Sequence, residues 1–397
     1  MSEWKYVKLK QLIQDIGDGG TPSTFDNGNF GGSINWAVVD DIKPEIFSTK
    51  ETLTDKGYKK CSAKLWPIDS IILTTGATIG EVGIAKIELC TKQGITGIVP
   101  NCWANNLFLR YWLEHNKNQL LRYSQGTTFK EIRPRPLGNL RIKFPEPFTR
   151  KSVDIQEKIA KILSTVDKNI EQTKKTIEKA ERLKKSMMQN LLTGKIRTDG
   201  LKPKIKKIFL NPIVSMKSLQ KYYKEEIPDN YKLIQLNKLI YLNYGFALGN
   251  SNIQSGPYPV YGSNGAIGYH YDYKVEGPGI IVGRKGSVGE VVWSEENFYQ
   301  IDTTYYIKLK SNKVSLRWIY YILKYLNLNL LNSATGVPGL NRRDALSLYI
   351  LKPKYEEQQN ISKKLDSIQE KIKANNSKML RLQKLKKSLM QNLLTGK

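Results

Sequence analysis

The side chains best suited to chemistry in this sequence are basic and hydroxyl groups on glycine-rich loops. Arg284, Lys285 and Ser287 follow a β-like run, and the loop Thr74-Thr75-Gly76-Ala77-Thr78 holds the equivalent place earlier in the chain. Such side chains hydrogen-bond base edges and phosphates, and free backbone N–H groups bind phosphate oxygens. The two loops therefore predict nucleic-acid contacts, with Arg284 and Lys285 as the strongest candidates. A solvent-exposed hairpin is the alternative.

Two further stretches are dense in arginine and lysine. Lys130, Arg133 and Arg135 follow Gln125-Gly126-Thr127-Thr128-Phe129, and Arg342 and Arg343 follow the equivalent residues 334–341. A basic loop of this kind is suited to clamp phosphates. Hydroxyl and amide groups on other turns are weaker candidates, which alternatively stabilise the turns themselves. The complete set of predicted DNA-binding residues is Thr21, Ser23, Thr74, Thr75, Thr78, Lys130, Arg133, Arg135, Ser263, Asn264, Arg284, Lys285, Ser287, Arg342 and Arg343.

Motifs for catalysis in this chain are weak. The string Asp40-Asp41-Ile42-Lys43 is the nearest approach to the carboxylates and lysine of a metal-dependent nuclease, but it also describes an acidic turn after a strand. Asn211-Pro212-Ile213-Val214 lacks the second proline and the aromatic residue of an amino-methyltransferase loop. There is no Gly-x-x-x-x-Gly-Lys-Ser/Thr run, and Gly262–Gly268 has the wrong spacing for a dinucleotide loop. We therefore expect no catalytic residue and no metal site.

Composition indicates a polyanionic partner. Among 397 residues, 63 Lys and Arg against 36 Asp and Glu give a formal charge of +27. No run of about 18 apolar residues and no apolar N-terminal signal core is present, so the sequence predicts a cytoplasmic protein without a membrane partner. Cys61, Cys90 and Cys102 contain no Cys-x-x-Cys pair, which indicates neither a disulfide framework nor a zinc site.

An internal repeat predicts the long helices that must position these loops. Leu183–Lys195 returns as Leu385–Lys397 with one change, Met187 to Leu389, at a shift of 202 residues. Apolar residues at heptad spacing precede both copies, which predicts two long amphipathic helices that pair antiparallel within the chain. The glycine of each terminal Thr-Gly-Lys closes its helix in the left-handed conformation. The predicted helix-pairing residues are Leu163, Val166, Ile170, Ile177, Met187, Leu191, Leu365, Ile368, Ile372, Met379, Leu389 and Leu393.

Two alternatives to this pairing remain, because each helix can instead cap its own domain or pair with another protein. In the first half of the chain, Trp4–Ile13 and the runs at 34–39 and 70–74 predict strands and a short helix, and 105–119 predicts a helix. Prolines at 134, 136, 145 and 147 are expected to exclude a helix there, with the long helix beginning near Asp154.

The second half replays this plan. Trp4–Ile13 matches Tyr231–Ile240 in pattern, and Gly76–Val82 matches Lys285–Val291, whereas the residues between these anchors diverge. We therefore predict an α+β protein with a pseudo-two-fold internal repeat: two similar mixed α/β domains joined by two long antiparallel coiled-coil helices. The expected segments are domain 1 (1–150), helix 1 (151–195), a basic connector (196–229), domain 2 (230–354) and helix 2 (355–397).

The repeat suits a nucleic-acid-binding protein whose two domains, here called heads, lie at a fixed separation and each read a different sequence. A helix from 156 to 192 would be on the order of 55 Å long, against about 34 Å for one duplex turn. The heads could then reach two major-groove segments of one DNA duplex. In the connector, Lys202, Lys204, Lys206 and Lys207, with lysines at 217, 221 and 224, form either a solvated face or a phosphate contact.

The helix ends Leu-Met-Gln-Asn-Leu-Leu-Thr-Gly-Lys, the loop Gly19–Ser23 followed by Ile34-Asn35-Trp36, and Tyr258–Gly265 with Gly268-Tyr269 together resemble the specificity subunit of type I restriction-modification enzymes. The resemblance covers nearly the whole chain except the connector. It implies two target recognition domains, each reading half of a bipartite double-stranded DNA sequence.

The resemblance also implies partners. The paired helices would dock two methyltransferase subunits, which recruit restriction subunits, while S-adenosylmethionine, ATP and Mg bind those partners and this chain carries no cofactor. A stand-alone DNA-binding or coiled-coil scaffold protein is the alternative, and a nuclease using Asp40 and Asp41 is a third hypothesis.

Overall fold

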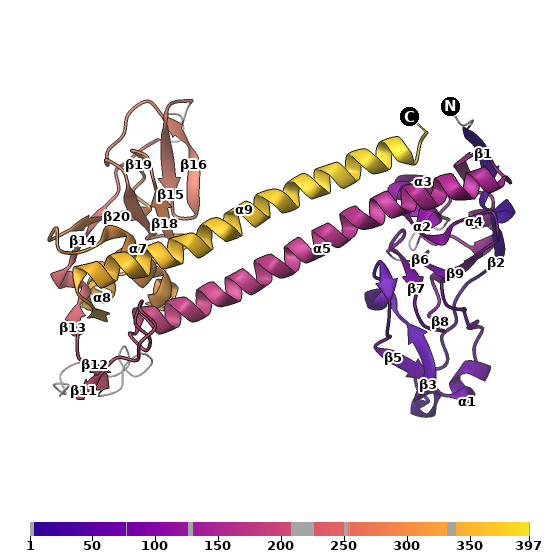
Figure 1. Ribbon diagram of the computed structural model, residues 1–397, viewed down its shortest axis with the longest axis horizontal. Helices are drawn as coiled ribbons and strands as arrows, with labels where there is room; N and C mark the ends of the chain where they lie inside the picture. The colour runs from indigo at the N-terminus through magenta and orange to yellow at the C-terminus, as the bar shows by residue number, and fades with distance from the viewer. Residues whose placement is uncertain are drawn as a thin grey trace. The chain divides into compact units, whose positions relative to one another are not determined.

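The computed structural model describes residues 4–76, 78–125, 130–207, 226–249, 253, 255–331 and 339–396. It divides into two compact units, one comprising residues 1–174 and 377–397 and the other residues 175–376. The two long helices, α5 (Arg150–Leu192) and α9 (Tyr355–Leu393), each contribute residues to both units (Figure 1). Of the sequence-based predictions, Ala77, residues 126–129, 211–214 and 334–338, and lysines 217, 221 and 224 lie outside the described residues.

Unit 1 is built on a five-stranded sheet of order β2-β9-β6-β7-β4, with a three-stranded sheet β5-β3-β8 and the pair β1-β10. Branched residues such as those of Ile71-Ile72-Leu73 are fully buried in its central strand, which is why that run forms sheet. The strands are β1 (Trp4–Lys8), β2 (Ile13–Gly17), β3 (Phe30–Ala37), β4 (Glu45–Ile46), β5 (Glu51–Leu53), β6 (Ile71–Thr74), β7 (Val82–Ala85), β8 (Cys90–Thr91), β9 (Ile95–Pro100) and β10 (Arg141–Pro145), and the short helices are α1 (Asp55–Lys59), α2 (Asn106–His115), α3 (Lys117–Leu121) and α4 (Pro134–Gly138).

Unit 2 repeats the central plan with the sheet β14-β20-β17-β18, the three-stranded sheet β16-β15-β19 and the pair β13-β21. In both units a strand ending at the glycine-rich loop pairs antiparallel with strands on either side. The strands are β11 (Ile205–Lys207), β12 (Glu226–Pro228), β13 (Lys232–Gln235), β14 (Ile240–Tyr244), β15 (Tyr258–Gly262), β16 (Gly265–His270), β17 (Gly279–Gly283), β18 (Val291–Ser294), β19 (Tyr299–Gln300), β20 (Thr304–Leu309) and β21 (Tyr349–Lys352), with helices α7 (Leu316–Leu326) and α8 (Arg342–Ser347). The predicted repeated α+β fold is confirmed.

The expectation that prolines exclude a helix between 134 and 147 is wrong. Pro134 and Pro136 open the five-residue helix α4, and Pro145 ends strand β10. The first N–H groups of a helix have no partner inside the helix, so a proline there costs nothing in hydrogen bonding, and its fixed φ favours the first turn. The long helix also begins at Arg150, four residues before the predicted start near Asp154.

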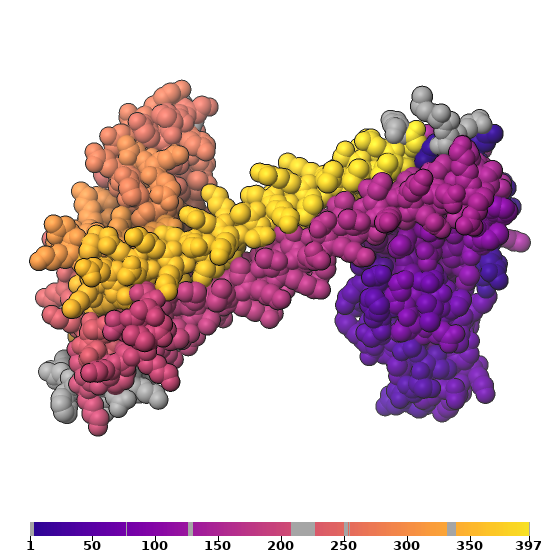
Figure 2. All heavy atoms as spheres, in the orientation of Figure 1, coloured from indigo at the N-terminus to yellow at the C-terminus, as the bar shows by residue number. Residues whose placement is uncertain are grey.

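The paired helices complete the core of each unit. In unit 1, Ile159 and Leu163 of α5 share a core with Met390 of α9 and the adjoining Leu394. In unit 2, the roles are exchanged, because Leu191 and Leu192 of α5 pack with Ile361 and Leu365 of α9. The start of each helix thus lies beside the end of the other, and their side chains lie against each other on the face shown in Figure 2.

None of the twelve predicted helix-pairing residues is exposed. Six are buried: Leu163, Val166, Leu191, Leu365, Ile368 and Ile372. The other six are partly buried: Ile170, Ile177, Met187, Met379, Leu389 and Leu393. A stripe that is covered along its length is what a helix with a packing partner requires.

Each long helix also binds the start of a short helix through a buried glutamine, and the two glutamines occupy the same position in the repeat. Gln156 Oε1 accepts a hydrogen bond from the backbone N–H of Asn105 at 2.8 Å, and Gln358 Oε1 accepts from that of Ser315 at 2.9 Å. Asn105 and Ser315 are the residues that cap α2 and α7. Both glutamines are fully buried, so the repeat extends to how the helices hold the sheets.

The helix ends confirm the predicted left-handed glycines. Gly194 and Gly396 both have φ of +68°. Each is seated against an aromatic residue of the unit that it completes. A β-carbon at Gly194 would lie 3.1 Å from Tyr231, and one at Gly396 would lie 2.5 Å from Trp4. Trp4 and Tyr231 occupy matching positions in the repeat, so the two helix ends fit equivalent seats.

Candidate nucleic-acid interface

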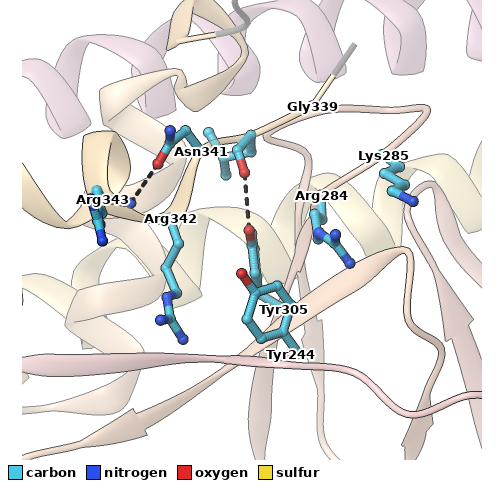
Figure 3. A pocket seen from close by; sticks show the side chains of 9 residues that line it. Tyr244, Arg284, Lys285, Tyr305, Gly339, Asn341, Arg342 and Arg343 are labelled. Atoms are coloured by element: carbon cyan, nitrogen blue, oxygen red, sulfur yellow. Dashed lines mark hydrogen bonds between the residues drawn. The ribbon is translucent and has the colours of Figure 1, made fainter. Parts of the chain in front are cut away.

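The described part of unit 2 contains a basic pocket of about 650 Å³ (Figure 3). It is formed where the end of β14 and the start of β20 meet the loop after β17 and the segment that leads into α8. Two pairs of predicted contact residues meet here, Arg284 with Lys285 and Arg342 with Arg343, although more than fifty positions of sequence separate the pairs. The residues that line the pocket are Tyr244, Arg284, Lys285, Tyr305, Gly339, Leu340, Asn341, Arg342 and Arg343.

The backbone at Arg284 is held on both sides. Its N–H donates to the carbonyl of Thr303 at 2.9 Å, and its own carbonyl accepts from the N–H of Leu340 at 2.8 Å. The N–H of Lys285 donates to the same Thr303 carbonyl at 3.1 Å. The backbone that carries the two basic side chains is therefore fixed to the residue before β20 and to the segment preceding α8, which limits the entropy lost when they bind a ligand.

An aromatic pair forms the floor between the basic groups. The ring centroids of Tyr244 and Tyr305 are 5.2 Å apart, and the Arg284 guanidinium lies 4.8 Å from the Tyr244 centroid. The Arg342 guanidinium lies 5.1 Å from the same ring. Two cations thus lie near one tyrosine ring, and each is attracted by the negative charge of the ring's π-system. Burial, followed by the proximity of Tyr244, raises the pKa of Tyr305, which keeps this phenol neutral, and its hydroxyl donates to the Leu340 carbonyl at 3.0 Å.

The start of α8 presents the remaining basic groups. Asn341 caps the helix, because its Oδ1 accepts a hydrogen bond from the N–H of Arg343 at 2.8 Å. Arg342 and Arg343 are exposed beside it. Exposed arginines next to a pocket suit phosphate oxygens, which need charge but no fixed register.

The weaker candidates of unit 2 lie around this pocket to different degrees. Ser263, in the turn between β15 and β16, reaches the glycine-rich loop, since its Oγ would lie 3.1 Å from a β-carbon at Gly286. Ser287 is partly buried in the loop itself, and Asn264 is exposed in the turn. The structure thus brings Ser263 and Ser287 to the loop of Arg284.

Unit 1 has the same backbone frame at the equivalent place. The N–H groups of Thr75 and Gly76 both donate to the carbonyl of Gly94, and the N–H of Ile132 donates to the carbonyl of Thr75. These bonds correspond one to one to those of Arg284, Lys285 and Leu340. Thr75 therefore occupies the position of Arg284, and Glu131 that of Gly339.

The side chains on this frame differ completely from those of unit 2. Thr74 and Thr75 are buried, and Thr75 Oγ1 lies 2.9 Å from Thr96 Oγ1 inside the sheet. The hydroxyls of Thr74 and Thr75 both bond within the protein, so we do not propose them as DNA contacts. Asp18 occupies the position that Tyr244 has in unit 2. The next residues along the chain, Gly19 and Gly245, approach backbone carbonyls at matching positions of the repeat. Burial first, then the nearby Glu131, raises the pKa of Asp18, against the opposing effect of its bond from the Gly19 N–H.

The other unit 1 candidates lie on the surface. Arg133 and Arg135 are exposed at the start of α4, where unit 2 has Asn341 and the two arginines of α8, and the exposed Lys130 precedes this segment. Thr78 and Ser23 are exposed, and Thr21 Oγ1 accepts from the N–H of Gln93 at 3.4 Å. The backbone carbonyl of Ser23 accepts a hydrogen bond from Asn29 Nδ2 at 2.9 Å, which does not involve the Ser23 hydroxyl.

Sequence reasoning missed the residues on the floor of both sites, Tyr244, Tyr305, Asp18 and Glu131. The signal was the repeat itself. Aligning Trp4–Ile13 with Tyr231–Ile240 and continuing without a gap pairs Asp18 with Gly245 rather than Tyr244. A β-bulge between Ile13 and Asp15 inserts one residue in unit 1, and this shift hides the true correspondence.

The acidic string at 40–43 forms the turn that its alternative interpretation describes. Asp41 is buried and its carboxylate accepts from the N–H groups of Val38 and Lys50 at 3.0 and 3.2 Å. Asp40 pairs with the exposed Lys50 side chain at 2.8 Å. Within the described ranges, no three His, Cys, Asp or Glu side chains are grouped as for a metal ion. Nor does any helix in these ranges have the length and apolar character to cross a membrane.

Comparison with known proteins provides independent evidence on the family of this chain. A family model described as the type I restriction modification DNA specificity domain matches residues 1–182 and 228–384. The MjaIX specificity subunit of a type I restriction enzyme from Methanocaldococcus jannaschii is 33% identical over 195 residues, 47% of this chain and 43% of that protein. That alignment spans less than half of the relative. The MjaVIII specificity subunit of the same organism is 23% identical over 434 residues, covering 100% of this chain and 93% of the relative.

Solved structures show the same fold. The type I restriction-modification S subunit from M. genitalium superposes with a TM-score of 0.68 at 17% identity, covering 99% of this chain and 96% of that chain. A chain from a structure of a type I R-M system gives a TM-score of 0.53 at 16% identity, covering 99% and 98%.

Proposed function

This chain belongs to the type I restriction-modification DNA specificity family and is a specificity subunit rather than an enzyme, and we propose that each of its units reads one half of a bipartite double-stranded DNA target. The observation that carries the proposal is the shared backbone frame with different side chains. A frame built twice, with Tyr244 and Arg284 in one copy and Asp18 and Thr75 in the other, suits two readers of different half-sites.

Charge supports DNA as the ligand. The formal charge of +27 favours a polyanion, and exposed arginines flank the equivalent loops of both units at Arg133 and Arg135 and at Arg342 and Arg343. The shared arginines would hold phosphates, which fixes the register of each unit on the duplex. The residues that differ between the units would then contact base edges. The paired helices would set the spacing between the half-sites.

The helices would also dock two methyltransferase subunits. Leu183 and Leu385 hold the same register in the repeat and are 52% and 47% exposed. A single exposed leucine is common on protein surfaces, but two at the same register of an internal repeat offer two equivalent apolar contact points. Because the repeat presents one such leucine in each unit, it offers two equivalent points for two copies of one partner. Restriction subunits would join through those partners, which would also bind S-adenosylmethionine, ATP and Mg, and the complex would act in the cytoplasm.

The docking proposal predicts a stoichiometry. Leu183→Asp or Leu385→Asp alone should leave one methyltransferase subunit bound, and the double variant should leave none, because each charge disrupts one equivalent contact. Native mass spectrometry of the co-expressed complex measures the number of bound subunits. Leu380→Asp is the matched control, since Leu380 is also exposed on α9, at 60%, but has no leucine partner in the repeat. Loss of both subunits in either single variant would contradict two independent docking points.

The test of function is a genome-wide map of methylated bases in the host. The map is recorded with the reading frame intact, deleted, and restored from a second locus. We expect a two-part motif with a fixed gap to disappear on deletion and to return on restoration. A map that is unchanged by deletion would rule out a role in specifying modification and favour a stand-alone DNA-binding protein.

A further inference from the structure

We propose that the pocket of unit 2 reads a guanine, with Arg284 as the residue that specifies this base. The inference rests on the proposed function, since it names the base class that one of the two readers recognises. It concerns only unit 2, and it separates Arg284 from the other basic residues around it.

The plane of the Arg284 guanidinium is fixed by two neighbours. It lies 4.8 Å from the Tyr244 ring centroid, and its Nη1 donates to the carbonyl of Asp302 at 3.0 Å. A guanidinium has five N–H donors in a planar fork, and the described side-chain hydrogen bond engages one of them. The others remain for a ligand, already oriented before it arrives. Planar, pre-oriented donors are what bidentate recognition requires.

The pocket wall selects for acceptors. None of the nine described lining residues carries a carboxylate, and Arg284, Lys285 and Arg342 can only donate. In the major groove, guanine presents two acceptors, N7 and O6, side by side. Adenine and cytosine each place an amino donor there, and thymine places a methyl group beside one acceptor. A wall of donors is therefore complementary to guanine, whereas adenine and cytosine would each keep an unpaired amino group and thymine would offer only one acceptor.

Position distinguishes Arg284 from a phosphate contact. Arg342 and Arg343 are exposed at the start of α8, whereas Arg284 is partly buried beside the Tyr244 ring. Phosphates run along the outside of the duplex and base edges lie deeper in the groove. The exposed pair is therefore placed for the backbone and the recessed arginine for a base.

The equivalent place in unit 1 lacks this donor set. Thr75, which takes the position of Arg284, is buried and bonded to Thr96, and Asp18 and Glu131 replace Tyr244 and Gly339. These carboxylates repel the acceptor edge of guanine. The guanine preference therefore belongs to one half-site only, and the recognised sequence is asymmetric.

The experiment compares wild type, Arg284→Lys and Arg284→Gln. Each full chain, purified together with the subunits that accompany it, selects from a randomised double-stranded DNA library, and the bound duplexes are sequenced. Lysine keeps the charge but loses the fork, so Arg284→Lys is the matched control for a phosphate contact. Thermal unfolding of each variant verifies that the chain is folded.

We expect wild type to select a two-part sequence with a fixed guanine in one half. Arg284→Gln should lower the preference for that guanine by roughly 5- to 150-fold and should favour adenine, which glutamine pairs bidentately. Arg284→Lys should lower the preference for guanine less, because lysine can still donate to the guanine acceptors. The other half and the gap should not change. Retention of the guanine in Arg284→Gln, or equal relaxation of both halves, would overturn the assignment while leaving the two-part reader intact. Selection of no sequence by wild type would overturn the proposed function, and the guanine assignment with it.

Discussion

The two repeated helices place a lysine at the same register, Lys184 and Lys386, in opposite electrostatic surroundings. Lys386 Nζ is 2.8 Å from both Glu114 Oε1 and Asp167 Oδ1, and its side chain is only 17% exposed. Lys184 donates to Gln369 Oε1 and, among the described residues, has no such pair of carboxylates within salt-bridge distance. Burial first, then repulsion from Lys324 and Arg317, lowers the pKa of Lys184. Replacing each lysine by methionine should therefore have different consequences.

The stability lost in Lys386→Met depends on which partners the carboxylates of Glu114 and Asp167 retain. Stranding a fully buried charge costs about 3–5 kcal/mol, and an exposed pair is worth about 0–1 kcal/mol. Arg110 still lies 2.8 Å from Glu114, and Tyr111 still donates to Asp167 at 2.7 Å. We therefore expect a loss of about 1–2 kcal/mol from unit 1, which corresponds to roughly 2–8 °C in its unfolding temperature.

Lys184→Met should be close to neutral. It loses one hydrogen bond to Gln369, worth about 1 kcal/mol, but it removes a partly buried charge that faces two other cations. Because the folded-state pKa of Lys184 lies below its ordinary value, the charged form is penalised in the folded protein at neutral pH. That penalty fades as pH rises toward the ordinary lysine pKa, so any gain from the substitution should shrink at high pH.

Differential scanning calorimetry of the full chain measures both variants under identical conditions. A double-mutant cycle of Lys386→Met with Glu114→Gln isolates the ion pair, with an expected coupling of about 1 kcal/mol. The matched control is Lys387→Met, because Lys387 is an exposed lysine next to Lys386 on the same helix. Equal losses for Lys386→Met and Lys184→Met would refute the claim that the carboxylates of unit 1 distinguish the two positions.

Three further outcomes are expected from the described contacts. Gly194→Ala and Gly396→Ala should each cost about 2 kcal/mol by chemical denaturation, since both need a left-handed backbone and an added β-carbon would clash with Pro228 or with Trp4; a neutral result at either glycine would contradict this. Asp18→Asn should stabilise the protein at neutral pH, because a raised folded-state pKa means that the ionised carboxyl is penalised, and the gain should vanish as pH falls below the ordinary carboxyl pKa; a gain that grows on acidification would reverse the sign. Asp41→Ala should cost about 1–3 kcal/mol, since it strands two backbone N–H groups, whereas Asp40→Ala should stay within about 0.5 kcal/mol in thermal unfolding; similar losses for both would count against the turn.

Much of the fold could be predicted because its signals are periodic or duplicated. The heptad stripes and the Thr-Gly-Lys ends indicate both long helices, and the repeated loop motifs indicate that a second domain copies the first. These features depend on local patterns that a sequence displays directly. The failure at the prolines had a different cause, because Pro134 and Pro136 were judged by residue type rather than by position within a helical turn.

The candidate site could be predicted only in part. Arg284, Lys285, Arg342 and Arg343 were identified because cations on glycine-rich loops are conspicuous, and the structure brings them to one pocket. Tyr244 was missed because a tyrosine at the end of a strand is unremarkable in a sequence with 22 tyrosines. Its role depends on the pairing of β14 with β20, a long-range contact that no local pattern encodes.

The contrast between near-identical helix ends and divergent pockets has a structural cause. Each helix end completes the core of a unit, with Met390 and Leu394 entering unit 1 and Leu191 and Leu192 entering unit 2. The seats that receive these ends are equivalent, so the same residues fit both, and a change in either end leaves a cavity or a clash. The frame consists of backbone hydrogen bonds. In unit 2 the exposed or partly exposed pocket side chains, such as Arg284 and Arg342, stand on it without forming those bonds, whereas the buried Tyr305 supports it through the Leu340 carbonyl. Substitution in a pocket can therefore alter the base that is read without destabilising the helices that hold both readers.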